Sequence, residues 1–257
     1  MFRRTIAAAL AAVAGLALAG CGDNSPAAST SPGSGDLSGT VTVFAAASLT
    51  GTFSRLGKDF EAAHPGVKVV FNFAGSSALA QQINQGAPAD VFAPAAQKNL
   101  EQVADRGTAA TFVRNRLEIA VPKGNPGKVT GLKDFADQDR KIALCAEQVP
   151  CGAAARKVFE AAKITPSPDT LEQDVKAALT KVGLGEVDAA LVYKTDVLAA
   201  KDKVEGIEFP EAAQAVNDYP IAALTKAKNP GGAQAFVEFV LSPQAKPTLT
   251  AAGFEVP

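Results

Sequence analysis

The chain repeats one local pattern, in which a short apolar strand runs through small residues into an amphipathic helix. The first example is Val41–Ala45, followed by Ser48 and by Phe53, Leu56 and Phe60 at three- and four-residue steps. This change from a continuous apolar run to helical spacing predicts a strand whose carboxyl end meets a helix start. Because strands alternating with helices build α/β sheets, the pattern constrains the fold more than any other feature.

Ser48 occupies the point where this strand gives way to the helix. Open α/β sheets bind ligands at the carboxyl ends of their strands, and free N–H groups at a helix start favour anions. Serine is also a preferred residue for capping a helix start. Taken alone, Ser48 is therefore better explained as a helix cap than as a ligand-binding residue.

Later helix starts change that judgement. Ser76 follows the strand that ends at Phe73, and another helix begins after it, so Ser76 repeats the position of Ser48. Cys151 stands in a Pro-Cys-Gly corner before a third helix. The recurrence of such corners favours an anion site built from helix starts.

The remaining segments continue the alternation. Strands are predicted at 41–45, 67–73, 89–93, 117–122, 141–145, 186–193, 206–209 and 219–224. Helices are predicted at 50–63, 78–85, 98–106, 153–162, 170–182, 195–200 and 233–241, with a helical turn at 132–136.

These segments predict an α/β fold of two lobes, each a mainly parallel sheet flanked by helices. The chain enters the second lobe near 117–122 and returns near 219–224. The first lobe is therefore discontinuous, comprising 39–119 and 222–257, and the second lobe spans 120–221. Two lobes joined by two strands form a hinge with a cleft between them.

The first twenty residues have the composition of an export signal, with Arg3 and Arg4 before the apolar run Ile6–Ala19. The run ends in Leu-Ala-Gly-Cys21, which resembles the lipobox of bacterial lipoproteins and implies cleavage before Cys21 and its lipidation. The alternative is an ordinary secretory cleavage site followed by a chance cysteine. Residues 21–38, rich in Ser, Pro, Ala and Gly, predict a disordered linker. We therefore expect an exported protein, lipid-anchored on the extracytoplasmic side of the cell membrane.

Composition argues against several other functions. The net charge is −1 without a basic run, which argues against nucleic acid as a partner. One His and three Cys leave little material for a transition-metal site or a His-based catalyst. A secreted serine hydrolase using Ser48 would need a base, and His64 stands at a helix end without a Gly-x-Ser-x-Gly elbow elsewhere.

Two cysteines remain after Cys21. Cys145 and Cys151 enclose a short loop, and an oxidising compartment favours a disulfide between them. The alternative is a pair of reduced, buried cysteines. No Cys-x-x-Cys is present, so a zinc site is not expected.

Five motifs together carry a family resemblance: Thr42-Val-Phe-Ala-Ala-Ala-Ser48-Leu-Thr, Phe73-Ala-Gly-Ser76-Ser, Gln85-Gly-Ala-Pro-Ala-Asp90-Val-Phe, Val149-Pro-Cys151-Gly and Leu191-Val-Tyr193. From Gly39 to Pro257 the chain resembles the molybdate/tungstate-binding lipoproteins of ABC uptake transporters, which are type II periplasmic solute-binding proteins. The resemblance implies that fold, no catalysis, and delivery of the oxyanion to a membrane permease by a protein that we expect to be a monomer.

The family also implies a ligand set. The oxyanion would be held by the hydroxyls of Ser48, Ser76 and Tyr193 and by the backbone amides of Cys151 and Val175. Cys151 replaces a small, alanine-like residue, which leaves its amide in place. These residues are not expected to coordinate a metal ion directly. No cofactor is expected, and the oxyanion is the bound ligand.

The donor chemistry agrees with this set, because a fully deprotonated dianion can only accept hydrogen bonds and each helix start adds about half a positive charge. Another oxyanion, such as sulfate or phosphate, remains the closest alternative. An iron-binding relative is less favoured, because the chain lacks the clustered tyrosines of such sites.

Overall fold

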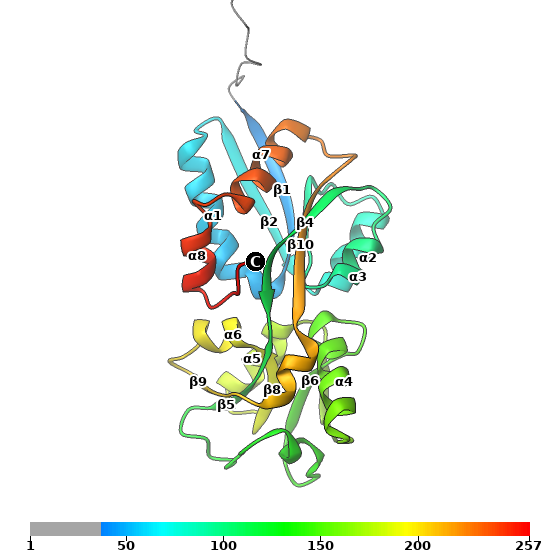
Figure 1. Ribbon diagram of the computed structural model, residues 1–257, viewed down its shortest axis with the longest axis vertical. Coiled ribbons are helices and arrows are strands. Elements are labelled where there is room, and N and C mark those ends of the chain that lie inside the picture. The colour runs from blue at the N-terminus through cyan, green and yellow to red at the C-terminus, as the bar shows by residue number, and fades with distance from the viewer. Residues whose placement is uncertain (1–36) are drawn as a thin grey trace, which may run out of the picture. The chain divides into compact units, whose positions relative to one another are not determined.

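The computed structural model describes residues 37–257, so the predicted export signal, Cys21 and most of the predicted linker lie outside the described residues. The described chain forms two five-stranded sheets, each with helices packed against it (Figure 1). Between residues 37 and 257, no helix has the length and apolar character needed to cross a membrane.

The first sheet has the strand order β2-β1-β3-β10-β4. Its strands are β1 (Gly39–Ala46), β2 (Val67–Ala74), β3 (Val91–Ala93), β4 (Arg106–Asn115) and β10 (Asn217–Leu224). β1 pairs in parallel with β2 and β3, whereas β10 pairs antiparallel with β3 and β4. β10 is thus the one strand of this sheet that runs against the others.

Helices cover both faces of the first sheet because its strands are apolar on both sides. Val41 and Val43 of β1 belong to one core with helix α1, while Phe44, the next residue along the strand, joins a second core with α2. The fully buried rings of this core include Phe53, Phe60 and Phe236, and burial of each contributes about 1.5–3 kcal/mol. The helices of this lobe are α1 (Thr50–Ala63), α2 (Ser76–Asn84), α3 (Gln97–Glu101), α7 (Pro230–Leu241) and α8 (Lys246–Ala251), with a 3₁₀ turn η1 (Ala47–Leu49).

The second sheet repeats this design with the order β7-β6-β8-β5-β9. Its strands are β5 (Leu117–Pro122), β6 (Ile142–Cys145), β7 (Thr170–Glu172), β8 (Ala189–Tyr193) and β9 (Val204–Ile207). Here β5 alone runs against the other four strands. The helices are α4 (Pro150–Ala162), α5 (Val175–Gly183) and α6 (Lys194–Ala199), with 3₁₀ turns η2 (Leu132–Ala136) and η3 (Pro210–Ala215).

The α/β class and the pair of helix-flanked sheets are confirmed, and α1 has the predicted bounds. Two helix predictions were too long. Residues 170–172 form the edge strand β7, because they pair with β6, and Asp174 caps the helix that begins only at Val175. α3 ends at Glu101, and β4, which the sequence analysis did not predict, begins at Arg106 because it pairs with the distant β10.

The lobes are connected where β4 continues into β5 and where η3 leads into β10 (Figure 1). β4 and β10 lie side by side in the first sheet, and β5 belongs wholly to the second. From this sheet membership we propose that the chain changes lobe at residues 116 and 216, a few residues before each boundary expected from the sequence.

Candidate functional site

A small cavity lies between the two lobes, and all five residues expected to bind the oxyanion line it. The first lobe contributes η1, the start of α2 and the segment after β3. The second lobe contributes the starts of α4 and α5 and the end of β8. The lining residues are Ala46, Ala47, Ser48, Ala74, Gly75, Ser76, Ala95, Val149, Pro150, Cys151, Asp174, Val175 and Tyr193.

The cavity has a volume of about 10 Å³, which is close to the room needed for a single water molecule. A sugar, peptide or other large solute does not fit a site of this size with the lobes in this arrangement. None of the described lining residues is Lys, Arg or His. A ligand between the lobes is therefore met by neutral donors.

The two serines reach the cavity from the first lobe. Ser48 lies in η1, and its Oγ is 3.0 Å from the hydroxyl of Tyr219. Ser76 is the first residue of α2, and its Oγ accepts a hydrogen bond of 2.9 Å from the amide of Ala95. Because that bond uses a lone pair of Ser76, its hydroxyl proton remains free for a ligand.

Interpreting Ser48 as a helix cap is wrong. The capping position of α1 belongs to Leu49, and no side chain caps either η1 or α1. Ser48 is instead buried with only 6% of its surface exposed, and its hydrogen bond to Tyr219 spans 171 residues of sequence. The local pattern correctly predicted that Ser48 lies between a strand and a helix, but the hydroxyl bonds to Tyr219 and not to the helix start.

The second lobe brings two helix starts to the cavity. Cys151 is the second residue of α4, after Pro150, and Val175 is the first residue of α5. Within residues 37–257 neither amide donates a hydrogen bond. Free amides at two helix starts, each with about half a positive charge, favour a negatively charged ligand without a cationic side chain.

Asp174 is the one acidic residue among those that line the cavity. Its Oδ1 accepts hydrogen bonds from the amides of Lys176 and Ala177, at 2.8 and 3.0 Å. The carboxylate therefore caps α5 and leaves the amide of Val175 unused.

Tyr193 is the third hydroxyl of the cavity and ends strand β8. Its side chain is 1% exposed, and the hydroxyl has no hydrogen-bond partner in the part of the chain that the structure describes. Burial, with smaller contributions from Tyr219 and Asp196, raises the pKa of Tyr193 well above its ordinary value. The hydroxyl is thus a protonated donor, and leaving it unpaired costs about 1–3 kcal/mol that an anionic ligand would recover.

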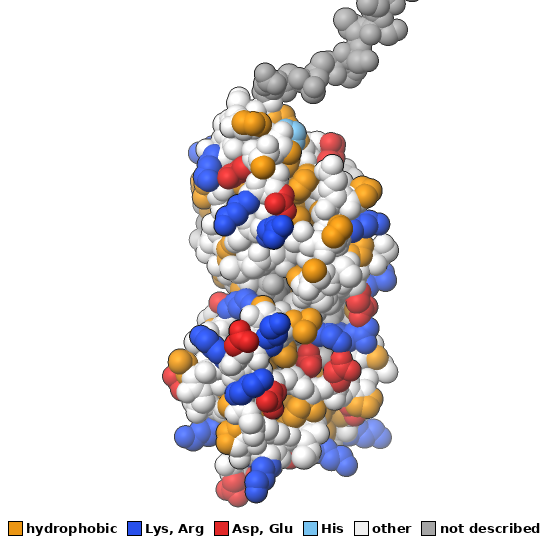
Figure 2. All heavy atoms as spheres, turned by 90° about the vertical axis from the view of Figure 1, so that its left-hand side faces the viewer, with side chains coloured by type: hydrophobic (Ala, Val, Ile, Leu, Met, Phe, Trp, Pro, Cys, Tyr) orange, Lys and Arg blue, Asp and Glu red, His pale blue; other side chains and the backbone are white. Residues whose placement is uncertain are grey.

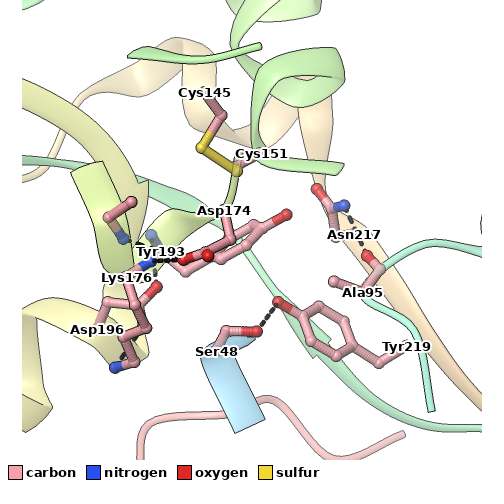
Figure 3. The surroundings of a disulfide bond; sticks show 11 residues. Ser48, Ala95, Cys145, Cys151, Asp174, Lys176, Tyr193, Asp196, Asn217 and Tyr219 are labelled. Carbon is pink, nitrogen blue, oxygen red and sulfur yellow. Dashed lines mark hydrogen bonds and ion pairs between the residues drawn. A yellow bond between two sulfur atoms is a disulfide. The ribbon is translucent and has the colours of Figure 1, made fainter. Parts of the chain in front are cut away.

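An ion pair between the buried Asp196 and the partly exposed Lys176 lies behind the backbone of Tyr193. Asp196 is fully buried, its Oδ2 accepts from the amide of Tyr193 at 3.2 Å, and its Oδ1 is 2.9 Å from Lys176 Nζ (Figure 3). Burial raises the pKa of Asp196, and Lys176 opposes that rise. The pair connects α5 to the start of α6, so it fixes the end of β8 against the helix that carries Val175.

Cys145 and Cys151 are joined by a disulfide, with their Cα atoms 5.7 Å apart. Cys145 ends β6 and Cys151 lies in the first turn of α4, so the bond fastens the turn that carries the free amide to the sheet. Figure 3 shows the disulfide on one side of the Tyr193 ring and Ser48 with Tyr219 on the other.

Sequence reasoning missed three contributors to the site. Tyr219 and Ala95 hydrogen-bond to Ser48 and Ser76, and Gly75 lets the lobes approach, because a Cβ there would lie 2.2 Å from the carbonyl oxygen of Gln173. Only Tyr219 carried a usable signal, as one of two tyrosines in the chain and close to the returning strand.

The described residues give no support to a serine hydrolase that uses His64 or to a metal site. The ring of His64 packs on Phe60 at 4.5 Å, at the end of α1, and His64 does not line the cavity. Among residues 37–257, no group of three or more His, Cys, Asp or Glu is arranged to hold a metal ion.

Comparison with known proteins agrees with this geometry. Residues 41–255 match the family model described as bacterial extracellular solute-binding protein. The molybdate-binding protein ModA of Mycobacterium tuberculosis is 41% identical over 245 residues, which cover 93% of each chain.

Solved structures share the fold. The periplasmic molybdate-binding protein of Azotobacter vinelandii superposes with a TM-score of 0.69 at 22% identity, over 84% of this chain and 99% of that one. The sulfate-binding protein SubI of Mycobacterium tuberculosis gives a TM-score of 0.69 at 17% identity, over 84% and 86%. The chain belongs to the family of bacterial extracellular solute-binding proteins and has their two-lobed fold.

Proposed function

We propose that this protein captures molybdate or tungstate between its lobes and delivers the oxyanion to an ABC permease. The observation that carries the proposal is the donor set of the cavity. Three hydroxyls and two free amides converge there, from Ser48, Ser76, Tyr193, Cys151 and Val175, without a cationic side chain among the lining residues. A tetrahedral oxyanion without protons has acceptors alone and satisfies every one of these donors.

Uncharged donors suit a carrier that must also release its ligand. Each free helix start contributes about half a positive charge, so α4 and α5 together partly offset a dianion. The donors come from both lobes, so the full set of hydrogen bonds exists only while the lobes are together. Ligand binding therefore stabilises the closed arrangement, which is the form that docks on the permease.

Sulfate is the second candidate, because a sulfate-binding protein shares this fold with the same TM-score as a molybdate-binding one. The fold alone does not choose between them. The 41% identity to a molybdate-binding relative favours molybdate.

The wider setting is part of the same proposal. The protein is held to the outer face of the membrane by a lipid on Cys21, acts as a monomer, and works by binding and release without catalysis or a resident cofactor. Charges of both signs are interspersed on the face shown in Figure 2, so no single-signed surface stands out there.

Calorimetry of the mature protein with molybdate, tungstate, sulfate and phosphate tests the proposal. Molybdate should bind most tightly together with tungstate, and a thousandfold excess over the dissociation constant should stabilise the fold by about 4 kcal/mol. Replacing Ser76 by Ala should weaken binding by about 1.5–3 kcal/mol, the usual contribution of a hydrogen bond to a charged group. Absence of heat and of a melting-temperature shift with millimolar molybdate and tungstate would reject it.

A further inference from the structure

Two buried asparagines lie opposite each other where the chain passes between the lobes. Asn115 ends β4 and Asn217 begins β10, and the two residues pair across the antiparallel ladder. They stand directly beside the proposed lobe changes at residues 116 and 216. Neither asparagine lines the cavity between the lobes. Each can therefore act on a ligand only through other residues.

Asn217 is connected to the residue that supports Ser76. Its Nδ2 donates to the carbonyl oxygen of Ala95 at 2.8 Å (Figure 3), and the amide of Ala95 donates to Ser76 Oγ at 2.9 Å. Ala95 follows β3 and belongs to no helix or strand. These two hydrogen bonds therefore hold Ala95 between the crossing strand β10 and the Ser76 hydroxyl.

Asn115 makes the matching connection to the second lobe. Its Nδ2 donates to Thr195 Oγ1 at 2.8 Å, across the lobe boundary. Thr195 is buried in the first turn of α6, which begins directly after Tyr193. The amide of Lys194 also donates to the carbonyl oxygen of Arg116 at 3.0 Å. The crossing segment thus holds the start of α6 immediately after Tyr193.

The chemistry of the two positions is unusual for a buried strand. The neighbouring Val113 and Tyr219 carry large apolar or aromatic side chains, as buried strand positions usually do. A buried amide is costly unless it is hydrogen-bonded, and both asparagines meet this need. Their amides bond to the two segments that support a proposed oxyanion donor, one in each lobe.

We propose that Asn115 and Asn217 are positioning residues for the bound oxyanion. Asn217 holds Ser76 through Ala95, and Asn115 holds Tyr193 through Thr195. The inference rests on the proposed function of the cavity. A hydrogen bond weakens steeply when its donor is displaced or turned, so small shifts of either hydroxyl reduce affinity. The pair thereby links the geometry of the two crossing strands to one donor in each lobe.

Molybdate affinities of single and double variants, measured by calorimetry on the mature protein, test this. Asn217→Ala should weaken molybdate by about three- to tenfold, and in a Ser76→Ala background it should cause no further loss. In a Tyr193→Phe background it should still cause its full loss. A general loosening of the fold would weaken binding equally in both backgrounds, so the difference between them reports positioning.

Asn115→Ala should show the opposite dependence. Its loss of affinity, also about three- to tenfold, should vanish in the Tyr193→Phe background and persist in the Ser76→Ala background. Asn99→Ala is the matched control and should leave the affinity unchanged. Asn99 is a buried asparagine of the first lobe, and its amide bonds to Gln102 Oε1 at 3.2 Å.

Thermal unfolding shows whether each variant is folded. If an alanine variant is not, the serine variant at the same position takes its place, because serine keeps a polar group in the buried site but is shorter than asparagine. The same pattern of losses is expected from it.

The inference is overturned if both variants bind molybdate as the unmodified protein does, or if each loss is the same in the two backgrounds. For Asn115, a loss that persists in Tyr193→Phe would show action elsewhere, for example through the Tyr219 hydroxyl beside it. If the unmodified protein binds neither molybdate nor tungstate, it is the proposed function that fails.

Discussion

The Asp174 carboxylate caps α5 by accepting hydrogen bonds from the amides of Lys176 and Ala177, and it forms none with the amide of Val175, the next residue. Its Oδ1 accepts from Lys176 and Ala177 at 2.8 and 3.0 Å, while the Val175 amide has no partner among residues 37–257. Asp174 thus borders the cavity and orients the start of α5 without using its first amide, which stays available to the proposed oxyanion.

The cap and the charge of Asp174 can be separated by two substitutions. Asp174→Asn keeps a good cap and removes a negative charge beside the ligand, so molybdate affinity should stay the same or increase. Asp174→Ala should lower the free energy of unfolding by about 1 kcal/mol and weaken binding. Denaturant unfolding and calorimetry measure both effects. Equal weakening by Asn and Ala would show that the carboxylate itself is needed.

Tyr193→Phe should have opposite effects on the free and the bound protein. Without ligand, removal of an unpaired buried hydroxyl should raise the free energy of unfolding by about 1 kcal/mol. Molybdate affinity should fall by about 1.5–3 kcal/mol, because a hydrogen bond to a charged group is lost. Chemical unfolding with and without molybdate gives both numbers. A destabilised free protein would mean that the hydroxyl has a partner there.

Gly75→Ala should prevent the close approach of the lobes. The added Cβ would lie 2.2 Å from the carbonyl oxygen of Gln173, and backbone must move to make room. Overpacking of this kind costs about 1–3 kcal/mol, so affinity for every oxyanion should fall about tenfold or more. Gly51→Ala is the control, because nothing lies within 4 Å of its Cβ. Unchanged affinity in Gly75→Ala would show that binding does not need this contact.

Reduction of the Cys145–Cys151 disulfide should lower stability more than affinity. The chain-entropy model gives about 2 kcal/mol for so short a loop. Binding should change little, because the proposed ligand at Cys151 is its amide and not its sulfur. Unfolding and calorimetry with and without reductant test this, on mature protein lacking Cys21. Two thiols reacting in denaturant without reductant would contradict the disulfide.

The two tyrosines should ionise only when the protein unfolds at alkaline pH. The chain has two Tyr and no Trp, both Tyr are buried, and burial raises both pKa values above 10.0. Unfolded tyrosine releases its proton near pH 10, whereas the buried tyrosines of the folded protein keep theirs. The free energy of unfolding is therefore unaffected by these two groups below that pH and falls above it. The free energy of unfolding should fall by about 2.7 kcal/mol per pH unit when both tyrosines are ionised in the unfolded chain only. Ultraviolet titration should show tyrosinate appearing together with loss of secondary structure; earlier ionisation would contradict the burial.

Much of this protein followed from local sequence. The bounds of α1 and the locations of Ser48, Ser76 and Cys151 were predictable, because the change from strand to helix is a short-range pattern. The family resemblance then supplied Val175 and Tyr193, which no spacing rule would have selected.

Other features were decided only by the tertiary structure. β4 forms because it pairs with β10, about one hundred residues later, and Ser48 meets Tyr219 across 171 residues. The contact of Gly75 with Gln173 likewise depends on how closely the lobes approach. Local sequence determined where the donors stand along the chain, whereas the two strand crossings determined which donors meet. That is why Ser48 was identified at once, but its partner was not.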